Sequence, residues 1–335
     1  MTEPFVLKGV SVAPGTRKKI FIDIGSLYET AEIQIPVEVI HGKKKGPVLF
    51  ISAAVHGDEI NGVAIIKKLM QQPILKNIHG TLILIPIVNV YGFIHRSRYL
   101  PDRRDLNRCF PGSPDGSLAA RIAHHLITEI VDKSTYGIDL HTGAIHRPNL
   151  PHIRANLQDE KTAMLAHAFS TAVIINSSIP AGSLREAAQI HKVPICVYEA
   201  GEALRFNDTA IKIGLKGILS VMNNIGMIHT RHKDIVDDDT NTYIAKTSFW
   251  VRSPASGLLF TNVHLGHQVN KGDVLGVLTT PFGDEVKKII ARKDGIVIGI
   301  LDLPLINLGD AIYHIATFDD TDSVGEEIDS SDLYL

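Results

Sequence analysis

An apolar run meets a histidine and a glutamate in the stretch Val48-Leu49-Phe50-Ile51-Ser52-Ala53-Ala54-Val55-His56-Gly57-Asp58-Glu59. The first eight residues of this stretch are typical of a buried β-strand. His56 and Glu59 follow at its end, three positions apart, so both side chains can turn toward one point. The stretch therefore predicts a central sheet strand with polar side chains at its carboxyl end.

Strand-like runs alternate with helix-like stretches over most of the first 225 residues. The predicted strands are Val48–Val55, Thr81–Val88, Tyr136–Leu140, His152–Ala155, Val173–Asn176 and Ile195–Glu199. Buried strands that alternate with helices are typical of a sheet flanked by helices. Residues 1–45 alternate apolar and polar side chains instead, which predicts antiparallel strands at the entry to the chain. We therefore predict an α/β fold with a mixed central sheet flanked by helices.

His141 ends the predicted strand Tyr136–Leu140, much as His56 follows the first strand. In α/β sheets, functional side chains gather at the carboxyl ends of strands, so His56, Glu59 and His141 are expected to meet. Two imidazoles and one carboxylate leave a fourth zinc position open for water, as catalytic zinc sites do. The sequence therefore predicts one Zn²⁺ per chain, held by these three residues.

Five arginines fall within the thirteen residues Arg96–Arg108, in a segment that prolines mark as a loop. Arginine gives a planar, two-pronged grip on a carboxylate. A solvated basic loop is the alternative interpretation. The position of the loop, between the two predicted metal segments, favours a clamp for an anionic substrate.

Glu199 ends another predicted strand and is followed by Ala200-Gly201. A carboxylate at the sheet rim, beside a metal-activated water, can take a proton and pass it to a leaving amine. A helix N-cap or a structural salt bridge is the alternative role for Glu199. Glu202, three positions further on, is its rival as the base.

Composition and charge exclude several classes of protein. The chain has 335 residues, of which 44% are hydrophobic and 21% charged, which is ordinary for a globular protein. It carries no basic stripe interleaved with aromatics, so we expect no nucleic-acid partner. The longest stretch without Asp, Glu, Lys or Arg, Asn77–His95, is broken by glycines and a proline, so we expect no membrane span. Two cysteines and the absence of a signal-peptide pattern favour a cytoplasmic protein.

A small all-β module is predicted beyond residue 245, where glycines punctuate short strand-like runs. Gly266–Gly276 and Asp294–Val297 resemble a biotinyl/lipoyl-type barrel-sandwich domain. Such a carrier needs a lysine at a hairpin tip, whereas this tip reads Pro281-Phe282-Gly283-Asp284, so a scaffold role is favoured. The predicted domains are a catalytic domain (1–245, with a β-rich entry at 1–45), the β module (246–318) and an acidic tail (319–335). Seven acidic residues and no Lys or Arg between 319 and 332 predict that the tail is disordered.

Four ordered motifs resemble the succinylglutamate desuccinylase/aspartoacylase family of the zinc-carboxypeptidase superfamily. They are His56-Gly57-Asp58-Glu59, Asp105-Leu106-Asn107-Arg108, His141-Thr142-Gly143 and Glu199-Ala200-Gly201, and the resemblance covers about residues 45–225. It implies a zinc-carboxypeptidase-like fold and a zinc site made by His56, Glu59 and His141. The family pattern also suits the C-terminal β module.

The resemblance also implies roles for the remaining site residues. Asn107 and Arg108 would bind a carboxylate of the substrate, and Glu199 would act as the general base and then as the acid. An upstream arginine would polarise the scissile carbonyl and hold the oxyanion. Arg98 is our choice, with Arg103 and Arg104 left open because this loop differs in length from those of family members.

The leading hypothesis is a zinc-dependent amidohydrolase that deacylates a small anionic N-acyl amino acid. A metallocarboxypeptidase that trims peptide C-termini is the nearest enzymatic alternative. A non-catalytic zinc-binding protein is the alternative from another class, and the presence of Glu199 beside a full ligand set argues against it. The sequence specifies neither the acyl group nor the amino acid, and it is compatible with a homo-oligomer.

Overall fold

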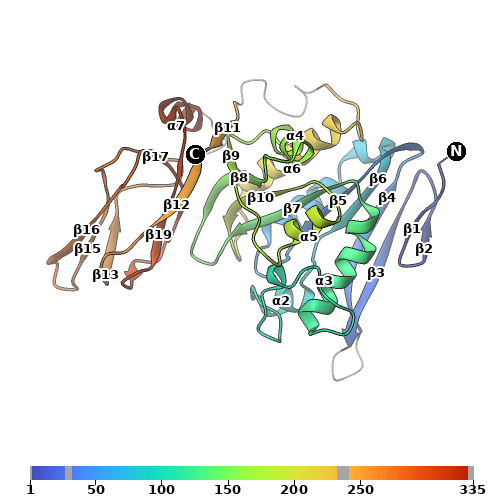
Figure 1. The fold of residues 1–335 in the computed structure, drawn as a ribbon, viewed down its shortest axis with the longest axis horizontal. Helices are drawn as coiled ribbons and strands as arrows, with labels where there is room; N and C mark the ends of the chain where they lie inside the picture. The colour runs from blue at the N-terminus through green and yellow to red at the C-terminus, as the bar shows by residue number, and fades with distance from the viewer. Residues whose placement is uncertain (1, 27–31, 232–240, 331–335) are drawn as a thin grey trace.

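The computed structural model describes residues 2–26, 32–231 and 241–330 (Figure 1). Within these residues, a mixed sheet runs through the molecule in the order β12-β19-β17-β8-β10-β7-β5-β6-β4-β3. The first 245 residues contribute β3 (Thr16–Ser26), β4 (Glu32–His41), β5 (Lys44–Ala53), β6 (His79–Ile85), β7 (Tyr136–Gly143), β8 (Asn149–Ala155), β9 (Val173–Asn176), β10 (Ile195–Glu202) and β11 (Tyr243–Ala245). A separate hairpin is formed by β1 (Phe5–Leu7) and β2 (Val10–Val12).

Parallel strands form the middle of the sheet, and antiparallel strands close the end nearest the N-terminus. β6, β5, β7 and β10 run parallel to one another, whereas β4 pairs antiparallel with both β6 and β3, and β8 pairs antiparallel with β10. The predicted fold class, a mixed α/β sheet with an antiparallel entry, is confirmed.

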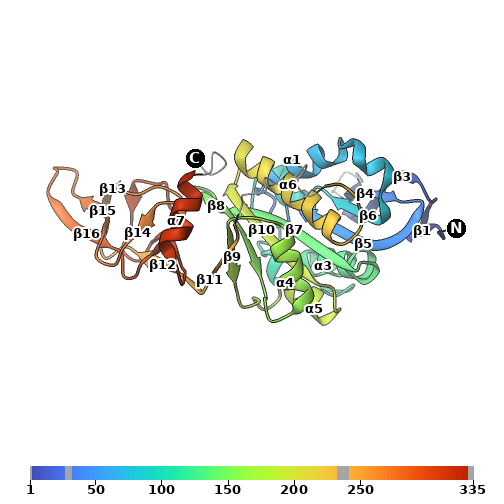
Figure 2. The same ribbon diagram turned by 90° about the horizontal axis from the view of Figure 1, so that it is seen from above.

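Helices cover both faces of this sheet because its strands are apolar on both sides. Leu49 and Ile51 of β5 pack into one core, and Phe50 between them packs into the other. The first core also takes in α1 (Asn61–Met70), α4 (Glu160–Ala168) and α6 (Asp208–Asn224), and the second α2 (Val90–His95), α3 (Leu118–Glu129) and α5 (Leu184–Ile190). Figure 2 shows α1 and α6 on the opposite side of the sheet from α3 and α5. Short 3₁₀ turns lie at Pro73–Asn77, Leu106–Arg108 and Val131–Lys133.

The C-terminal part of the chain is an all-β unit with its own apolar core. Its strands are β12 (Thr247–Arg252), β13 (Gly257–Thr261), β14 (Gln268–Val269), β15 (Val274–Thr279), β16 (Glu285–Ile290), β17 (Gly295–Ile300), β18 (Leu305–Ile306) and β19 (Ala311–Thr317). β16, β15, β13 and β18 form one sheet, and the others continue the central sheet through the pairing of Gly299 in β17 with Asn149 in β8. This unit, which projects away from the N-terminus in Figure 1, is called the C-terminal module below. We propose residues 246–318 as its bounds.

The acidic tail departs from the prediction of disorder. Helix α7 (Thr321–Ser330) occupies most of it, and residues 331–335 lie outside the described residues. Val324 and Ile328, one helical turn apart, are buried in a core with Leu150 and Ile296. The prediction of disorder, which rests on net charge, is therefore wrong for residues 321–330. Two apolar residues spaced by four dock this helix on the core.

None of the helices in the described parts of the chain combines the length and the apolar character that a bilayer span requires.

Candidate active site

His56, Glu59 and His141 meet at the carboxyl ends of β5 and β7, where the sequence predicts a metal site. All three are buried, and their ligand atoms lie within 4.8 Å of one another. His56 Nδ1 is 2.6 Å from Glu59 Oε1, and His141 Nδ1 is 2.8 Å from Glu59 Oε2. The loop after β5 is held tightly, since a Cβ on Gly57 would lie only 2.0 Å from the backbone of Gly92 in α2. The fold thus brings the three side chains together at one point.

A carboxylate contacts the far nitrogen of each imidazole. His141 Nε2 is 2.7 Å from Asp139 Oδ2, and His56 Nε2 is 3.1 Å from Asp105 Oδ1. Asp139 is itself anchored by a hydrogen bond from Ser52 Oγ at 2.7 Å. Metal-bound histidines almost always have such a partner, because it fixes the ring orientation and the tautomer.

The charges of this cluster shift the pKa values of its members. Burial lowers the pKa of His141, but the carboxylates of Asp139 and Glu59 outweigh it and raise that pKa well above 6.5. Burial likewise lowers the pKa of His56, and Glu59 and Asp105 again outweigh it and raise that pKa. For Glu59, burial acts to raise the pKa, yet the two histidines hold it far below its usual range. The cluster is therefore a strong site for positive charge.

A cavity of about 220 Å³ opens in front of the cluster. Its lining includes every residue that the sequence proposes for the site: His56, Glu59, Arg98, Asn107, Arg108, His141 and Glu199. Arg154 of β8 and Arg185 of α5 line it as well, whereas Arg103 and Arg104 do not. The cavity therefore favours Arg98 among the three arginines left open by the sequence.

Glu199, not Glu202, faces this cavity. Glu199 is paired with His141 across β10 and β7, so it lies at the same sheet rim as the His56-Glu59-His141 cluster. Its Oε2 accepts a hydrogen bond from Asn149 Nδ2 at 3.2 Å, and its Oε1 lies 3.6 Å from Arg154 Nε. Glu202 instead accepts a hydrogen bond from the backbone N–H of His146 at 2.9 Å. The position of Glu202 thus suits a structural role.

Comparisons with known proteins identify the family. A model of the succinylglutamate desuccinylase/aspartoacylase catalytic domain matches residues 45–225. The chain belongs to the succinylglutamate desuccinylase/aspartoacylase family. It is 28% identical over 296 residues to an N-alpha-acetyl-L-2,4-diaminobutyric acid deacetylase from Halomonas elongata, covering 85% of this chain and 86% of that protein.

Solved structures of the same family share this fold. The product-bound ectoine utilization protein EutE (DoeB) from Ruegeria pomeroyi superposes with a TM-score of 0.81 at 25% identity, covering 95% of this chain and 100% of that one. A succinylglutamate desuccinylase/aspartoacylase from Rhodobacter sphaeroides gives a TM-score of 0.80 at 23% identity, with coverages of 90% and 96%. Both matches extend into the C-terminal module, because at most a tenth of this chain lies outside them.

The arginines of this family member differ in how firmly they are held. Arg98 donates from Nε and Nη2 to Asp105 Oδ2 and from Nη1 to Glu59 Oε1. Arg185, which the sequence did not suggest, is buried and donates to Ser177 Oγ and to the carbonyl of Ser178. Burial, together with the charge of Arg154, lowers the pKa of Arg185 to about 10. Arg185 therefore stays charged at neutral pH and adds to the positive charge of the cavity.

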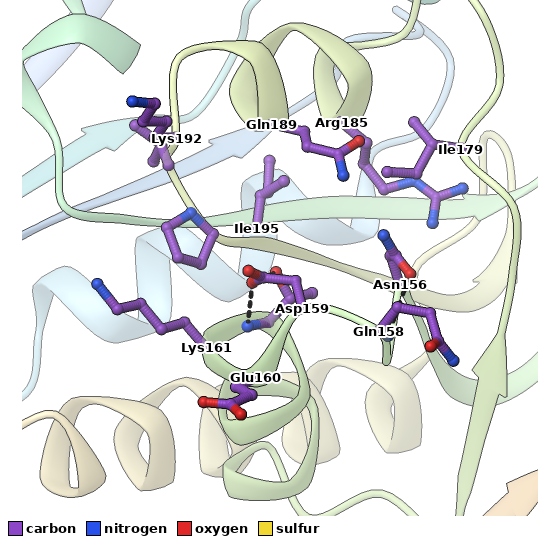
Figure 3. Close-up of a pocket in the computed structure, with 13 residues that line it drawn as sticks. Asn156, Gln158, Asp159, Glu160, Lys161, Ile179, Arg185, Gln189, Lys192 and Ile195 are labelled. Carbon is purple, nitrogen blue, oxygen red and sulfur yellow. Dashed lines mark hydrogen bonds between the residues drawn. The ribbon is translucent and has the colours of Figure 1, made fainter.

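A larger cavity of about 540 Å³ lies next to the first and shares Arg185 with it (Figure 3). No histidine is among its lining residues. Its Asp159 is engaged as the N-cap of α4, accepting a hydrogen bond from the Thr162 N–H at 2.8 Å. The larger cavity would be chosen on size alone, but the smaller one holds the candidate metal ligands and the candidate base.

Proposed function

We propose that this chain is a zinc-dependent deacylase that hydrolyses the amide bond of a small N-acyl amino acid. The observation that carries the proposal is the cavity in which a His-Glu-His cluster faces Glu199 and four arginines. Its volume of about 220 Å³ lies below the range of roughly 300–1,000 Å³ that holds drug-sized ligands, which favours a small substrate. The excess of arginine over glutamate in its lining favours an anionic one.

The donor set fits zinc. His56, Glu59 and His141 are the ligand types of catalytic zinc sites, and Asp105 and Asp139 already orient the two imidazoles. Zinc held by these three residues would supply a Lewis acid that lowers the pKa of water and polarises a carbonyl.

Glu199 supplies the proton transfers in this proposal. Its carboxylate takes a proton from the attacking water and returns it to the nitrogen of the leaving amino acid. The contacts with Asn149 and Arg154 hold this carboxylate at the rim of the cavity, facing the ligand cluster.

Substrate binding falls to the loop around Asn107 and Arg108. Asn107 Oδ1 accepts a hydrogen bond from the Leu184 N–H at 2.9 Å, which ties the loop to the start of α5. The guanidinium of Arg108 would grip the carboxylate of the amino acid. Arg98 uses three N–H groups on Asp105 and Glu59, and its remaining two would serve the carbonyl oxygen as negative charge develops there.

The named relatives support this class of reaction. The Halomonas elongata protein is a deacetylase of an N-acetylated amino acid and matches 85% of this chain. N-acetyl-2,4-diaminobutyrate therefore belongs in any substrate panel for this protein, alongside N-acetylaspartate and N-succinylglutamate.

The test is a deacylation screen of the zinc-loaded protein against N-acetyl and N-succinyl amino acids, with release of the free amino acid as the readout. A peptide with a free C-terminus, and the same peptide with its C-terminus blocked, serve as comparison substrates. We expect turnover of at least one N-acyl amino acid and little cleavage of either peptide. Faster trimming of the free peptide would instead establish the carboxypeptidase alternative.

A further inference from the structure

The segment from His146 to Asn149 lies between the C-terminal module and the end of β10. It connects β7, which carries His141, to β8, and a Cβ on Gly143 would lie 1.8 Å from the carbonyl oxygen of Arg147. The segment is therefore packed directly against the end of the strand that supplies a proposed zinc ligand. We call it the bracket.

Each residue of the bracket contacts the C-terminal module. The backbone N–H groups of Ile300 and Asp302 donate to the carbonyls of Pro148 and His146, at 3.3 and 2.9 Å. The guanidinium of Arg147 lies 5.6 Å from the centre of the Trp250 ring. Trp250 in turn stacks on His314, with ring centres 4.7 Å apart. The fourth contact is the pairing of Asn149 with Gly299.

The same bracket contacts both acidic residues at the end of β10. Asn149 Nδ2 donates to Glu199 Oε2 at 3.2 Å, and the His146 N–H donates to Glu202 Oε1 at 2.9 Å. Glu199 is proposed above as the base, whereas Glu202 lies outside the catalytic cavity. The bracket thus links the module to the orientation of the base.

Gly299 of the module pairs with Asn149 and leaves no free space beside its side chain. A Cβ at this position would lie 3.0 Å from Asn149 Oδ1, 3.2 Å from His314 Cβ and 3.7 Å from Trp250. The oxygen of the Asn149 amide therefore lies against the glycine of the module, while its nitrogen bonds Glu199. A side chain at 299 would push on the amide that holds the base.

We infer that the C-terminal module is a positioning element for catalysis, and that it acts on Glu199 through Asn149. The inference rests on the proposed function, because it concerns how the proposed base is held. Asn149 is a positioning residue and does not itself react. A role in orienting the base would explain why an all-β unit without a carrier lysine continues the catalytic sheet at this one position.

The kinetic test compares Asn149→Ala and Gly299→Ala with the wild-type enzyme. We expect kcat to fall roughly 10-fold in each variant, because a misplacement of about 1 Å at a reacting group can cost up to 10²-fold. KM and zinc content should stay within about twofold, since neither residue lines the cavity or the cluster. A loss confined to KM, or a loss of zinc, would overturn the inference.

Gly257→Ala is the matched control in the same module. A Cβ at Gly257 would lie 2.9 Å from the carbonyl oxygen of Thr279, so the crowding is similar, but β13 belongs to the other sheet of the module. We expect its kcat within about twofold of wild type. Equal losses in Gly257→Ala and Gly299→Ala would show that only the general integrity of the module matters. If Gly299→Ala does not fold, Asn149→Ala, which leaves the module intact, decides the question.

A double-variant cycle separates this inference from the proposed function. In a Glu199→Gln background, Asn149→Ala should cost less than about twofold, because the group that it positions is already inactive. A full 10-fold loss in that background would overturn the inference. Normal activity of Glu199→Gln alone would instead overturn the proposed function. If Glu199→Gln is inactive and Asn149→Ala is normal, only the positioning role fails.

Crystal structures of the wild type and both variants give a readout that needs no substrate. We expect the Glu199 carboxylate to shift by about 1 Å or to occupy more than one position in Asn149→Ala and Gly299→Ala. An unchanged Glu199 in both variants would overturn the inference regardless of turnover.

Discussion

The two walls of the proposed catalytic cavity are built differently: one carries the proposed metal ligands, and the other carries the residues proposed to act on the substrate. On the metal wall, the side chains of His56, Glu59 and His141 are at most 5% exposed, and both nitrogens of each imidazole contact a carboxylate. On the substrate wall, the side chains of Arg98 and Glu199 are 28% and 18% exposed. The metal wall is thus buried, whereas Arg98 and Glu199 on the substrate wall are partly exposed.

Because of this difference, we expect substitutions on the two walls to have different effects. In a buried cluster, each charged group is paired with its neighbours. Removing one member leaves a buried charge without a partner, which is strongly destabilising. Exposed, hydrogen-bonding side chains contribute gradually, since water replaces much of what a substitution removes. Substitutions on the metal wall should therefore abolish zinc binding and activity altogether. Substitutions on the substrate wall should lower activity by amounts that depend on the interaction removed.

His56→Ala tests the metal wall and should have the largest effect on zinc content and activity. We expect zinc content to fall from about one equivalent per chain to near zero, and activity to fall with it, because two ligands cannot hold a catalytic zinc. Elemental analysis of the purified protein provides the measurement. His79→Ala is the control, since His79 pairs with His229 at an exposed site away from the cavity. A His56→Ala protein with full zinc would contradict the ligand assignment.

Glu199→Gln tests the substrate wall at the residue that is paired with His141 across β10 and β7. It should keep zinc and fold but lose kcat by about 10²–10⁴-fold, the usual contribution of general acid–base catalysis. Glu202→Gln is the matched control and should stay near wild type, because Glu202 contacts the His146 N–H and lies outside the cavity. Steady-state kinetics on the best substrate of the screen measure both. A larger loss in Glu202→Gln would move the base to that residue.

Arg108→Lys tests the substrate wall, where we expect a partial loss of activity. Charge is kept, but an ammonium group cannot reproduce the two-pronged grip of a guanidinium. Losing a charge-assisted hydrogen bond costs about 1.5–3 kcal/mol, so kcat/KM should fall roughly 10- to 100-fold, mainly through KM. Amidating the substrate carboxylate should be costly for the wild type and add little for the variant. A wild-type enzyme indifferent to that amidation would disprove the clamp.

Much of the metal wall could be predicted from the sequence because it follows from strands. The expected strand Tyr136–Leu140 lies within β7 (Tyr136–Gly143), and Val48–Val55 overlaps β5 (Lys44–Ala53). Strand ends then bring His56 and His141 together by the rules of α/β sheets. Asp139 was overlooked although it lies two residues before His141, so the period of a strand places both on one face.

The rest depended on contacts between elements distant in sequence. Arg185 reaches the cavity from α5, a helix of seven residues that is too short to show a helical period in the sequence. No pattern in the sequence near Gly299 or Asn149 predicts that they pair. They are distant in sequence, and their contact joins the C-terminal module to the central sheet. Arg98 could not be separated from Arg103 and Arg104 until the loop was placed against Glu59.

The protein's stability should also change with pH, and the metal-free and zinc-bound forms should change in opposite directions. In the metal-free protein, His141 and His56 have raised pKa values, so their charged forms stabilise the fold fully below the unfolded value of about 6.5. That contribution is lost as the pH rises through the folded pKa values. Glu59 has a lowered pKa, so its contribution is present above about pH 4.3 and is lost only as the pH falls through its folded pKa. Zinc, by contrast, needs neutral imidazoles and binds better as the pH rises.

We therefore expect the Tm of the metal-free protein to fall as the pH rises above about 6.5, while the increase in Tm produced by zinc grows over the same range. The fall should be a few degrees, because about 1 kcal/mol corresponds to roughly 2–4 °C in domains of 150–250 residues. Differential scanning calorimetry with and without a chelator measures both trends. Asp139→Asn is the control, since it removes a carboxylate that raises the pKa of His141 and should flatten the fall. A metal-free Tm that stayed level or rose over this range would show that the histidines are not charged partners of Glu59, and the contrast between the two walls would lose its electrostatic basis.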